Sequence, residues 1–326
     1  MINRRVLMTA ISAASAALLG FGSAHAADDT YPEREVQLII PFSPGGATDI
    51  IFRLVASEAE QYLGTTIVPV NMAGAGATRG SRHVKDAKPD GYTILGSHDS
   101  IALSKLAGMV DYSYDAFEPV ALLTQTINMA GTYADHPVQD AAGIADYVEE
   151  NPGEVKFSMI PSSTDHFFWV QFFDAAGIDM KDVRLVGYPG TGDQVSALLA
   201  KEIDFAMLNL PSGGPYFESG DFRALGVAGE ERLDALPDVE TFREQGIDMD
   251  HATSRGIFAP KGTPQEVVDK IADAFGKALE SEELQNRITN EFGTLVRFLE
   301  GEDYQKFLDD NEAALSRAAE NIDFKD

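Results

Sequence analysis

The feature that most constrains the fold is a unit that recurs along the chain. It consists of a short apolar run, a turn rich in glycine or proline, and a stretch with helical spacing of apolar residues. The first copy runs from residues 36–42 through Pro44-Gly45-Gly46 into residues 49–63. Further apolar runs that end in such turns are residues 66–70, 92–95, 183–186 and 205–208. Strands that alternate with helices form parallel βαβ units, so we predict an α/β fold with helices on both faces of its sheets.

The length of the chain favours two lobes. A chain of 326 residues exceeds the usual size of one hydrophobic core. No low-complexity linker separates two halves, so we expect several chain crossings between the lobes, as in a hinged binding protein. Ligands of open α/β sheets bind at the carboxyl ends of the strands, where the loops gather. Residues 264–279, 281–291 and 301–319 have charged helical patterns and are predicted to form a closing layer.

The N-terminus has the pattern of an export signal. Arg4 and Arg5 precede an apolar run from Val6 to Phe21, and Ala24-His25-Ala26 offers the small residues that signal peptidase recognises. A membrane anchor would need about 18 or more consecutive apolar residues, and this run is shorter and contains hydroxyl side chains. We therefore expect cleavage near Ala26. The chain has no cysteine, which excludes a lipid-attachment cysteine and a disulfide framework.

The charge of the chain limits its partners. Asp and Glu number 52 against 25 Lys and Arg, so the formal net charge is −27. Binding to nucleic acid needs a basic face, and we expect no nucleic-acid partner. An anionic ligand would need a site that is locally positive or lined by backbone N–H groups.

The first glycine turn is a candidate for such a site. Gly45 and Gly46 let the backbone turn tightly and approach a ligand, and the helix after them offers unpaired N–H groups and the positive end of its dipole. Thr48 and Asp49 are equally consistent with a role as a helix cap. The second glycine-rich stretch, residues 74–80, has the spacing Gly-x-Gly-x-x-x-Gly and no apolar helix face after it. That pattern argues against a dinucleotide fingerprint.

A hydroxyl-rich loop precedes an aromatic helix in the middle of the chain. The hydroxyls at residues 162–164 can cap that helix, and they can also donate to a carboxylate at its N-terminus. The aromatic stripe at residues 167–173 has the helical spacing of a core face, which favours packing over a ligand box. Trp169, the only tryptophan, follows the loop by one turn, so we expect its emission to change on lobe closure. His166 has a local cap or a core hydrogen bond as its simplest interpretation. No second histidine stands at metal-ligand spacing, and no metal or other cofactor is expected.

Six motifs stand in order at residues 41–49, 74–76, 88–95, 187–190, 235–239 and 259–264, and they span nearly the whole chain after the signal. Together they resemble the TctC or Bug family, the substrate-binding subunits of tripartite tricarboxylate transporters. The resemblance implies a type II periplasmic binding protein: two Rossmann-like α/β lobes joined by a hinge, with a ligand cleft between them. It implies a signal peptide at 1–26, a first lobe of 27–127 and 229–326, and a second lobe of 128–228.

The resemblance also implies where a ligand carboxylate binds. Family members hold it on the first glycine loop and on serine or threonine loops of both lobes. Carried over position by position, the predicted ligand-binding residues are Ser43, Pro44, Gly45, Gly46, Ala47, Thr48, Asp49, Gly76, Ser97, His98, Ser162, Ser163, Thr164, His166, Tyr188, Gly190, Thr191, Asp193, Asn209 and Arg255.

Two positions depart from the family pattern. Ser97-His98-Asp99 stands where many relatives have small hydroxyl and glycine residues, so we expect a bulkier or more polar pocket. Arg255 stands where many relatives have an aromatic residue, and its planar fork suits a second carboxylate. This favours a di- or tricarboxylate ligand. The alternative is a surface Arg255 that pairs with one of the many acidic side chains.

The predicted function is capture of a small organic carboxylate by a monomeric periplasmic protein and its delivery to integral-membrane transporter subunits. The chain has no Gly-x-Ser-x-Gly, Ser-x-x-Lys or His-Glu-x-x-His motif and no cysteine, so an enzyme is not expected. A ligand-sensing receptor for a two-component sensor kinase is the alternative function, because the same closed lobe pair can dock on either partner.

Overall fold

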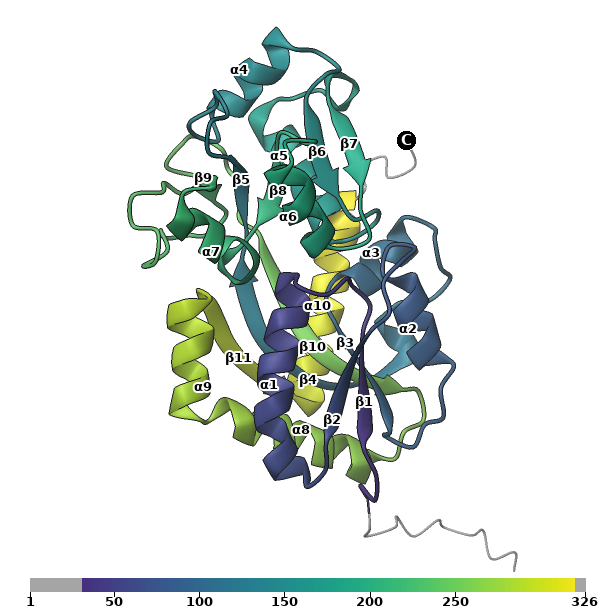
Figure 1. The fold of residues 1–326 in the computed structure, drawn as a ribbon. Helices are drawn as coiled ribbons and strands as arrows, with labels where there is room; N and C mark the ends of the chain where they lie inside the picture. The colour runs from purple at the N-terminus through teal and green to yellow at the C-terminus, as the bar shows by residue number, and fades with distance from the viewer. Residues whose placement is uncertain (1–30, 320–326) are drawn as a thin grey trace, which may run out of the picture.

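The computed structural model describes residues 31–319, which form two α/β lobes (Figure 1). The signal peptide expected at 1–26 lies outside the described residues. Within residues 31–319, every helix is too short or too polar to span a lipid bilayer.

The first lobe is built on a six-stranded sheet of order β11-β4-β10-β3-β1-β2. Its strands are β1 (Val36–Ile40), β2 (Ile67–Asn71), β3 (Thr93–Ser97), β4 (Phe117–Ile127), β10 (Ala252–Pro260) and β11 (Thr294–Glu300). β1 pairs in parallel with β2 and β3, as the strand-turn-helix unit predicts. β10 runs antiparallel to β3 and β4, and β11 runs antiparallel to β4, so this half of the sheet is not built from parallel βαβ units.

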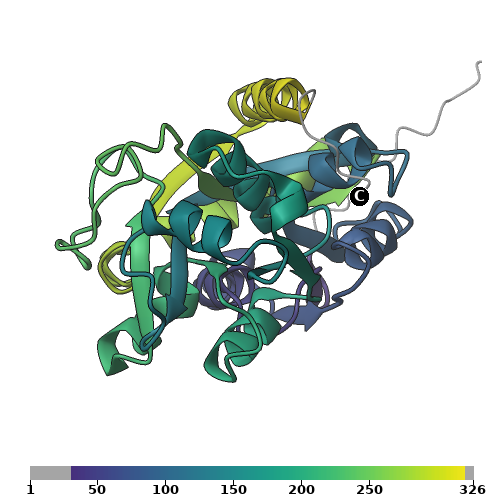
Figure 2. The ribbon, with the colours of Figure 1, turned by 90° about the horizontal axis from the view of Figure 1, so that it is seen from above.

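Helices cover both faces of this sheet. α1 (Ala47–Leu63) and α8 (Gln265–Leu279) lie on one face, while α2 (Thr78–Lys85), α3 (Ser100–Leu106) and α10 (Gly301–Ala319) lie on the other (Figures 1 and 2). Successive side chains of β1 point to opposite faces of the sheet, so each face has its own hydrophobic core. Leu38 and Ile40 pack in the core under α1 and α8, and Ile39 packs in the core on the α10 side. α9 (Glu282–Asn286) and the π-helical turn η3 (Arg287–Glu291) precede β11.

The second lobe contains a smaller sheet. Its strands are β5 (Met129–Tyr133), β6 (Lys156–Met159), β7 (Arg184–Gly187), β8 (Ala206–Leu208) and β9 (Phe222–Val227). β6 and β7 are parallel, β5 lies antiparallel between β8 and β9, and a bridge between Phe157 and Phe205 connects the two groups. The helices are α4 (Gly143–Glu150), α5 (Thr164–Ala176), α6 (Thr191–Leu199) and α7 (Leu210–Ser219).

The aromatic stripe of α5 forms the core of the second lobe. Trp169 is fully buried, its Nε1–H donates to the Ser158 carbonyl at 2.9 Å, and its ring centroid lies 4.8 Å from that of Phe157. The stripe is therefore core, as its spacing favours. The start of α5 lines the cavity between the lobes and Trp169 packs in the core of the second lobe, so the change of its emission on lobe closure stays a prediction.

The chain crosses between the lobes twice within the described residues. β4 continues through Asn128 into β5, and residues 228–251 connect β9 with β10. Residues 229–251, expected in the first lobe, place Phe242, Ile247 and Met249 in the hydrophobic core of the second. We therefore propose that the second lobe extends to residue 251, because the connection back to the first lobe is made only where β10 begins.

Candidate ligand-binding site

A small cavity lies between the two lobes, where the loops after β1, β3, β6 and β8 meet. Its volume is about 20 Å³, which is room for about one water molecule. The predicted residues that line it are Gly46, Ala47, Thr48, His98 and Arg255 from the first lobe and Ser163, Thr164, Thr191 and Asn209 from the second. The fold thus brings together segments that are far apart in the sequence.

Four helices direct their N-termini at this cavity. α1 begins at Ala47, α5 at Thr164 and α6 at Thr191, and Asn209 is the N-cap of α7. The first N–H groups of a helix have no partner inside the helix, and the helix dipole places a partial positive charge there. Figure 1 shows the start of α1 directed at the second lobe. These four helix starts therefore supply N–H groups and partial positive charge at the cavity.

Asp49 shapes the glycine turn and does not line the cavity. Its Oδ2 accepts the Gly45 N–H at 3.0 Å, and its Oδ1 accepts from Arg53 Nε at 2.7 Å and from Asn71 Nδ2 at 2.9 Å. Gly45 has φ 80°, a left-handed conformation that favours glycine. The turn is thereby fastened to the end of β2. The N-cap of α1 is Gly46, and no side chain caps this helix. Asp49 therefore does not act as a cap, and its side chain accepts a hydrogen bond from the turn before the helix.

Arg255 is the buried cation of the site. Its side chain is 1% exposed, so the alternative of a surface ion pair is wrong. Its Nε donates to Thr48 Oγ1 at 3.2 Å and its Nη1 donates to Thr126 Oγ1 at 2.6 Å. Among the described residues no carboxylate lies within 4.0 Å of this guanidinium. Burial lowers the pKa of Arg255 to about 9, while the more distant Asp99 acts in the opposite direction.

His98 connects the lobes at the cavity wall. Its ring stacks on Phe42 with a centroid distance of 4.5 Å, and its Nδ1 lies 2.8 Å from the hydroxyl of Thr164 in the second lobe. Burial lowers the pKa of His98 well below its usual value, and the nearby Arg255 lowers it further, so the ring is neutral at pH 7. Burial also raises the pKa of Asp99 to about 7, against the effect of Arg255. The pocket is polar at this position, as the departure from the family pattern predicts.

Sequence reasoning missed five lining residues, which are Phe42, Ile160, Asp165, Met207 and Thr253. Thr253 and Met207 each lie two positions before a predicted residue in extended backbone, so strand alternation could have found them. Asp165 gave no separate signal within the hydroxyl loop. Its Oδ2 accepts from the Ile160 N–H at 2.8 Å and from Gln194 Nε2 at 2.5 Å, while burial raises its pKa to about 7.

The other predicted residues lie at the contact between the lobes or behind the lining. A Cβ added to Gly190 would lie 2.6 Å from Cβ of Ser43, and a Cβ on Gly76 would collide with the Pro161 carbonyl. Pro44 makes a similar close contact with Gly192 of α6. These glycines let the lobes close. The predicted residues behind the lining or outside it are Gly45, Asp49, Ser97, Ser162, His166, Tyr188 and Asp193.

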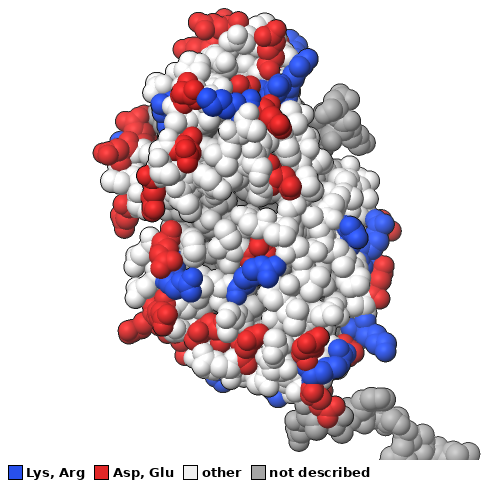
Figure 3. Space-filling model, viewed as in Figure 1, with Lys and Arg blue, Asp and Glu red and all other residues white. Residues whose placement is uncertain are grey.

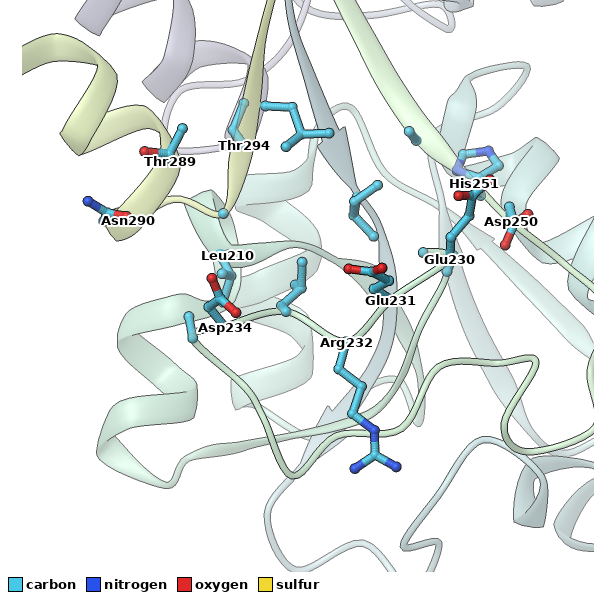
Figure 4. Close-up of a pocket in the computed structure, with 18 residues that line it drawn as sticks. Leu210, Glu230, Glu231, Arg232, Asp234, Asp250, His251, Thr289, Asn290 and Thr294 are labelled. Atoms are coloured by element: carbon cyan, nitrogen blue, oxygen red, sulfur yellow. The ribbon is translucent and has the colours of Figure 1, made fainter. Parts of the chain in front are cut away.

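A much larger surface depression lies on the hinge side, with a volume of about 870 Å³ (Figure 4). We call it the hinge groove, and it is lined by Ile127, Leu210 and parts of residues 228–235, 250–252 and 289–295. Its side chains include Glu230, Glu231 and Asp234, which repel an anion. The small interlobe cavity, with Arg255 and four helix N-termini, is therefore the better candidate for an anionic ligand despite its size.

The rest of the surface is acidic. Figure 3 shows acidic side chains spread over both lobes, while the middle of that face, where the lobes meet, is largely uncharged. Within residues 31–319 no three His, Cys, Asp or Glu side chains are grouped so that they could hold a metal ion.

Comparisons with known proteins agree with this architecture. A relative from Cupriavidus necator, a UPF0065 protein in the gbd 5' region, is 31% identical over 86% of this chain and 86% of its own length. The solved structure of a periplasmic transporter is 30% identical with a TM-score of 0.85, and the match covers 91% of this chain and 99% of that one. MatC from Rhodopseudomonas palustris, solved with bound malate, is 27% identical with a TM-score of 0.80, covering 89% of this chain and all of MatC.

The family assignment follows from the match over most of the chain. Residues 51–323 match the TctC family, described as the tripartite tricarboxylate transporter family receptor. The fold of this chain matches that of its solved relatives over about nine tenths of its length. The chain is therefore a member of the TctC family of periplasmic solute-binding proteins.

Proposed function

We propose that this protein binds a small organic di- or tricarboxylate between its lobes in the periplasm and delivers it to the membrane subunits of a tripartite transporter. One observation carries the proposal: four helix N-termini and a buried arginine without a carboxylate partner converge on one cavity in a protein of net charge −27. The malate bound to MatC supports the same class of ligand.

The geometry favours a ligand with at least two carboxylates. One carboxylate can accept N–H groups at the starts of α1 and α6, which face each other where Gly46 meets Thr191. A second can pair with Arg255, which has planar donors suited to a carboxylate. Exclusion of water between closed lobes strengthens both interactions, because the local dielectric constant falls.

The closed lobes in this structure leave space for about one water molecule. A dicarboxylate is larger, so the lobes must separate for its entry and stay further apart while it is bound. The hydrogen bond between His98 and Thr164, which joins the lobes at 2.8 Å, lies where that separation has to occur.

A thermal-shift screen of the purified protein tests the proposal. We expect malate or citrate to raise the unfolding temperature, because a ligand that binds only the folded state adds about 2.7 kcal/mol at a hundredfold excess over its dissociation constant. Acetate tests the need for a second carboxylate, and putrescine tests whether charge of the opposite sign is accepted.

The Arg255→Ala variant makes this screen specific to the cavity. Its affinity for malate or citrate should fall at least tenfold, which corresponds to about 1.4 kcal/mol. Stabilisation by acetate equal to that by malate, or equal affinities of wild type and variant for every acid, would contradict the proposal.

A further inference from the structure

The hinge groove carries three carboxylates without a basic partner. Among the described residues no Lys, Arg or His nitrogen lies within 4.0 Å of Glu230, Glu231 or Asp234. Arg232, between them in sequence, is held by Glu244 at 2.8 Å, and Figure 4 shows its guanidinium pointing away from the carboxylates. The negative charge of this surface is therefore uncompensated within the described residues.

Apolar side chains lie beside these carboxylates. Leu295 is 55% exposed, the largest exposed fraction among the large hydrophobic side chains of the described residues. Ile127, Leu210 and Leu233 line the same groove. These four apolar side chains lie in one groove whose rim carries charge, and an apolar centre with a polar rim is the usual composition of a protein interface.

The groove is formed by both lobes. Leu210 and residues 228–235 belong to the side of the second lobe, whereas Thr294 and Leu295 belong to β11 of the first. A Cβ on Gly293 would collide with the Leu210 side chain, so the two walls touch at one end. Rotation of one lobe against the other must change the width of the groove.

A buried hydrogen-bond network connects the groove with the ligand cavity. Asn128, fully buried at the first crossing, lies with its Nδ2 2.9 Å from His251 Nδ1 and donates to Thr253 Oγ1 at 2.9 Å. Its Oδ1 accepts from Asn209 Nδ2 at 3.1 Å. His251 lines the groove, and Thr253 and Asn209 line the cavity. The two sites therefore share the hinge.

We propose that the hinge groove docks a segment of the membrane partner in which lysine or arginine side chains accompany an apolar side chain. The unpaired carboxylates bind the basic side chains, and Leu295 with its neighbours covers the apolar one. The walls from both lobes let the partner distinguish closed from open protein. The inference rests on the proposed function only in requiring a membrane partner, and it does not depend on the identity of the ligand.

Photocrosslinking in cells of the natural host tests this surface. The photoreactive residue p-benzoylphenylalanine replaces Leu295 in the full chain, and crosslinked peptides are mapped by mass spectrometry. We expect a product with an integral membrane protein, attached next to lysine or arginine residues. The double variant Glu231→Lys/Asp234→Lys should lower its yield at least tenfold.

A matched control carries the same change of charge elsewhere. Glu149 and Glu150 are exposed near the end of α4, so Glu149→Lys/Glu150→Lys should leave the yield within twofold of the unchanged surface. Equal losses in both double variants, crosslinks only to soluble proteins or to a second copy, or no product would overturn the proposal. The purified groove variant must also keep the stabilisation that malate gives the wild type. If malate stabilises neither protein, the proposed ligand class fails, while the crosslinking result still decides the docking surface.

Discussion

Replacing Arg255 by methionine should separate ligand binding from folding. The guanidinium is buried and touches the hydroxyls of Thr48 and Thr126, with no carboxylate of the described residues within 4.0 Å. A cation in this position disfavours the ligand-free folded protein and favours the complex with an anion. Methionine fills much of the same volume without the charge.

The expected magnitudes follow from the buried charge and its two hydrogen bonds. Burial lowers the pKa of Arg255 from 12.5 to about 9, which means that folding penalises the charged form by roughly 5 kcal/mol. Methionine removes this penalty and leaves the Thr48 hydroxyl without its partner, at a cost of about 1–3 kcal/mol, whereas Thr126 Oγ1 keeps Thr294 Oγ1 at 2.8 Å. The free energy of unfolding without ligand should therefore rise by about 2–4 kcal/mol. Loss of one member of a buried charge pair should lower affinity for malate by about 2–5 kcal/mol.

Urea denaturation and calorimetry measure the two quantities separately. The Arg255→Lys variant is the matched control, since it keeps the charge but loses the planar fork, and we expect it to bind more weakly than wild type and more tightly than Arg255→Met. A methionine variant that is several kcal/mol less stable without ligand and binds malate normally would refute the reasoning. Arg255 would then serve the fold alone.

Three other changes test separate parts of the site. Gly46→Val should lower malate affinity at least tenfold in a folded protein, because even a Cβ at residue 46 would lie 3.1 Å from Cβ of Thr191 in the closed state. Calorimetry should show that the second change Thr191→Gly restores part of this affinity. Burial raises the pKa of Asp165 from 3.8 to about 7, so its contribution to stability is full below pH 4 and is lost as the pH rises through 7. The free energy of unfolding of Asp165→Asn minus that of wild type, measured by urea denaturation, should therefore be up to about 4 kcal/mol larger at pH 8 than at pH 4. A difference that does not change with pH would contradict the raised pKa of Asp165. Asn128→Leu should lower the free energy of unfolding by about 1–3 kcal/mol, since it leaves buried polar partners unpaired; an unchanged urea midpoint would show that the hinge network contributes no stability.

Local patterns in the sequence predicted much of the architecture. The apolar run at 36–42 and the helical spacing at 49–63 became β1 and α1, and the charged pattern at 301–319 became α10. These predictions succeed because the period of the apolar positions depends only on neighbours within one element. The glycine turn at 44–46 and the hydroxyls at 162–164 likewise marked two of the helix N-termini that meet at the cavity.

Strand direction and lobe membership needed long-range information. β10 and β11 have no local feature that shows they run antiparallel to their neighbours, since pairing is decided by which edge of the sheet is free. Residues 229–251 are expected in the first lobe from the resemblance, and the packing of Phe242 and Met249 in the second core is what supports the proposal that they belong to the second lobe. The spacing around Trp169 indicated a buried face, and the tertiary structure shows that this face packs in the core of the second lobe.

The sequence by itself determined the types of side chain available for binding an anion: an arginine, a glycine turn and several hydroxyl loops in an acidic chain. The tertiary structure decided their roles. The fold buries Arg255 with no carboxylate of the described residues within 4.0 Å, and it brings four helix N-termini to one small cavity. The hinge groove, in contrast, is open and is lined by carboxylates. The physical reason is that burial and the sum of electric fields depend on which segments become neighbours in space, and residues that are adjacent in the sequence do not contain that information.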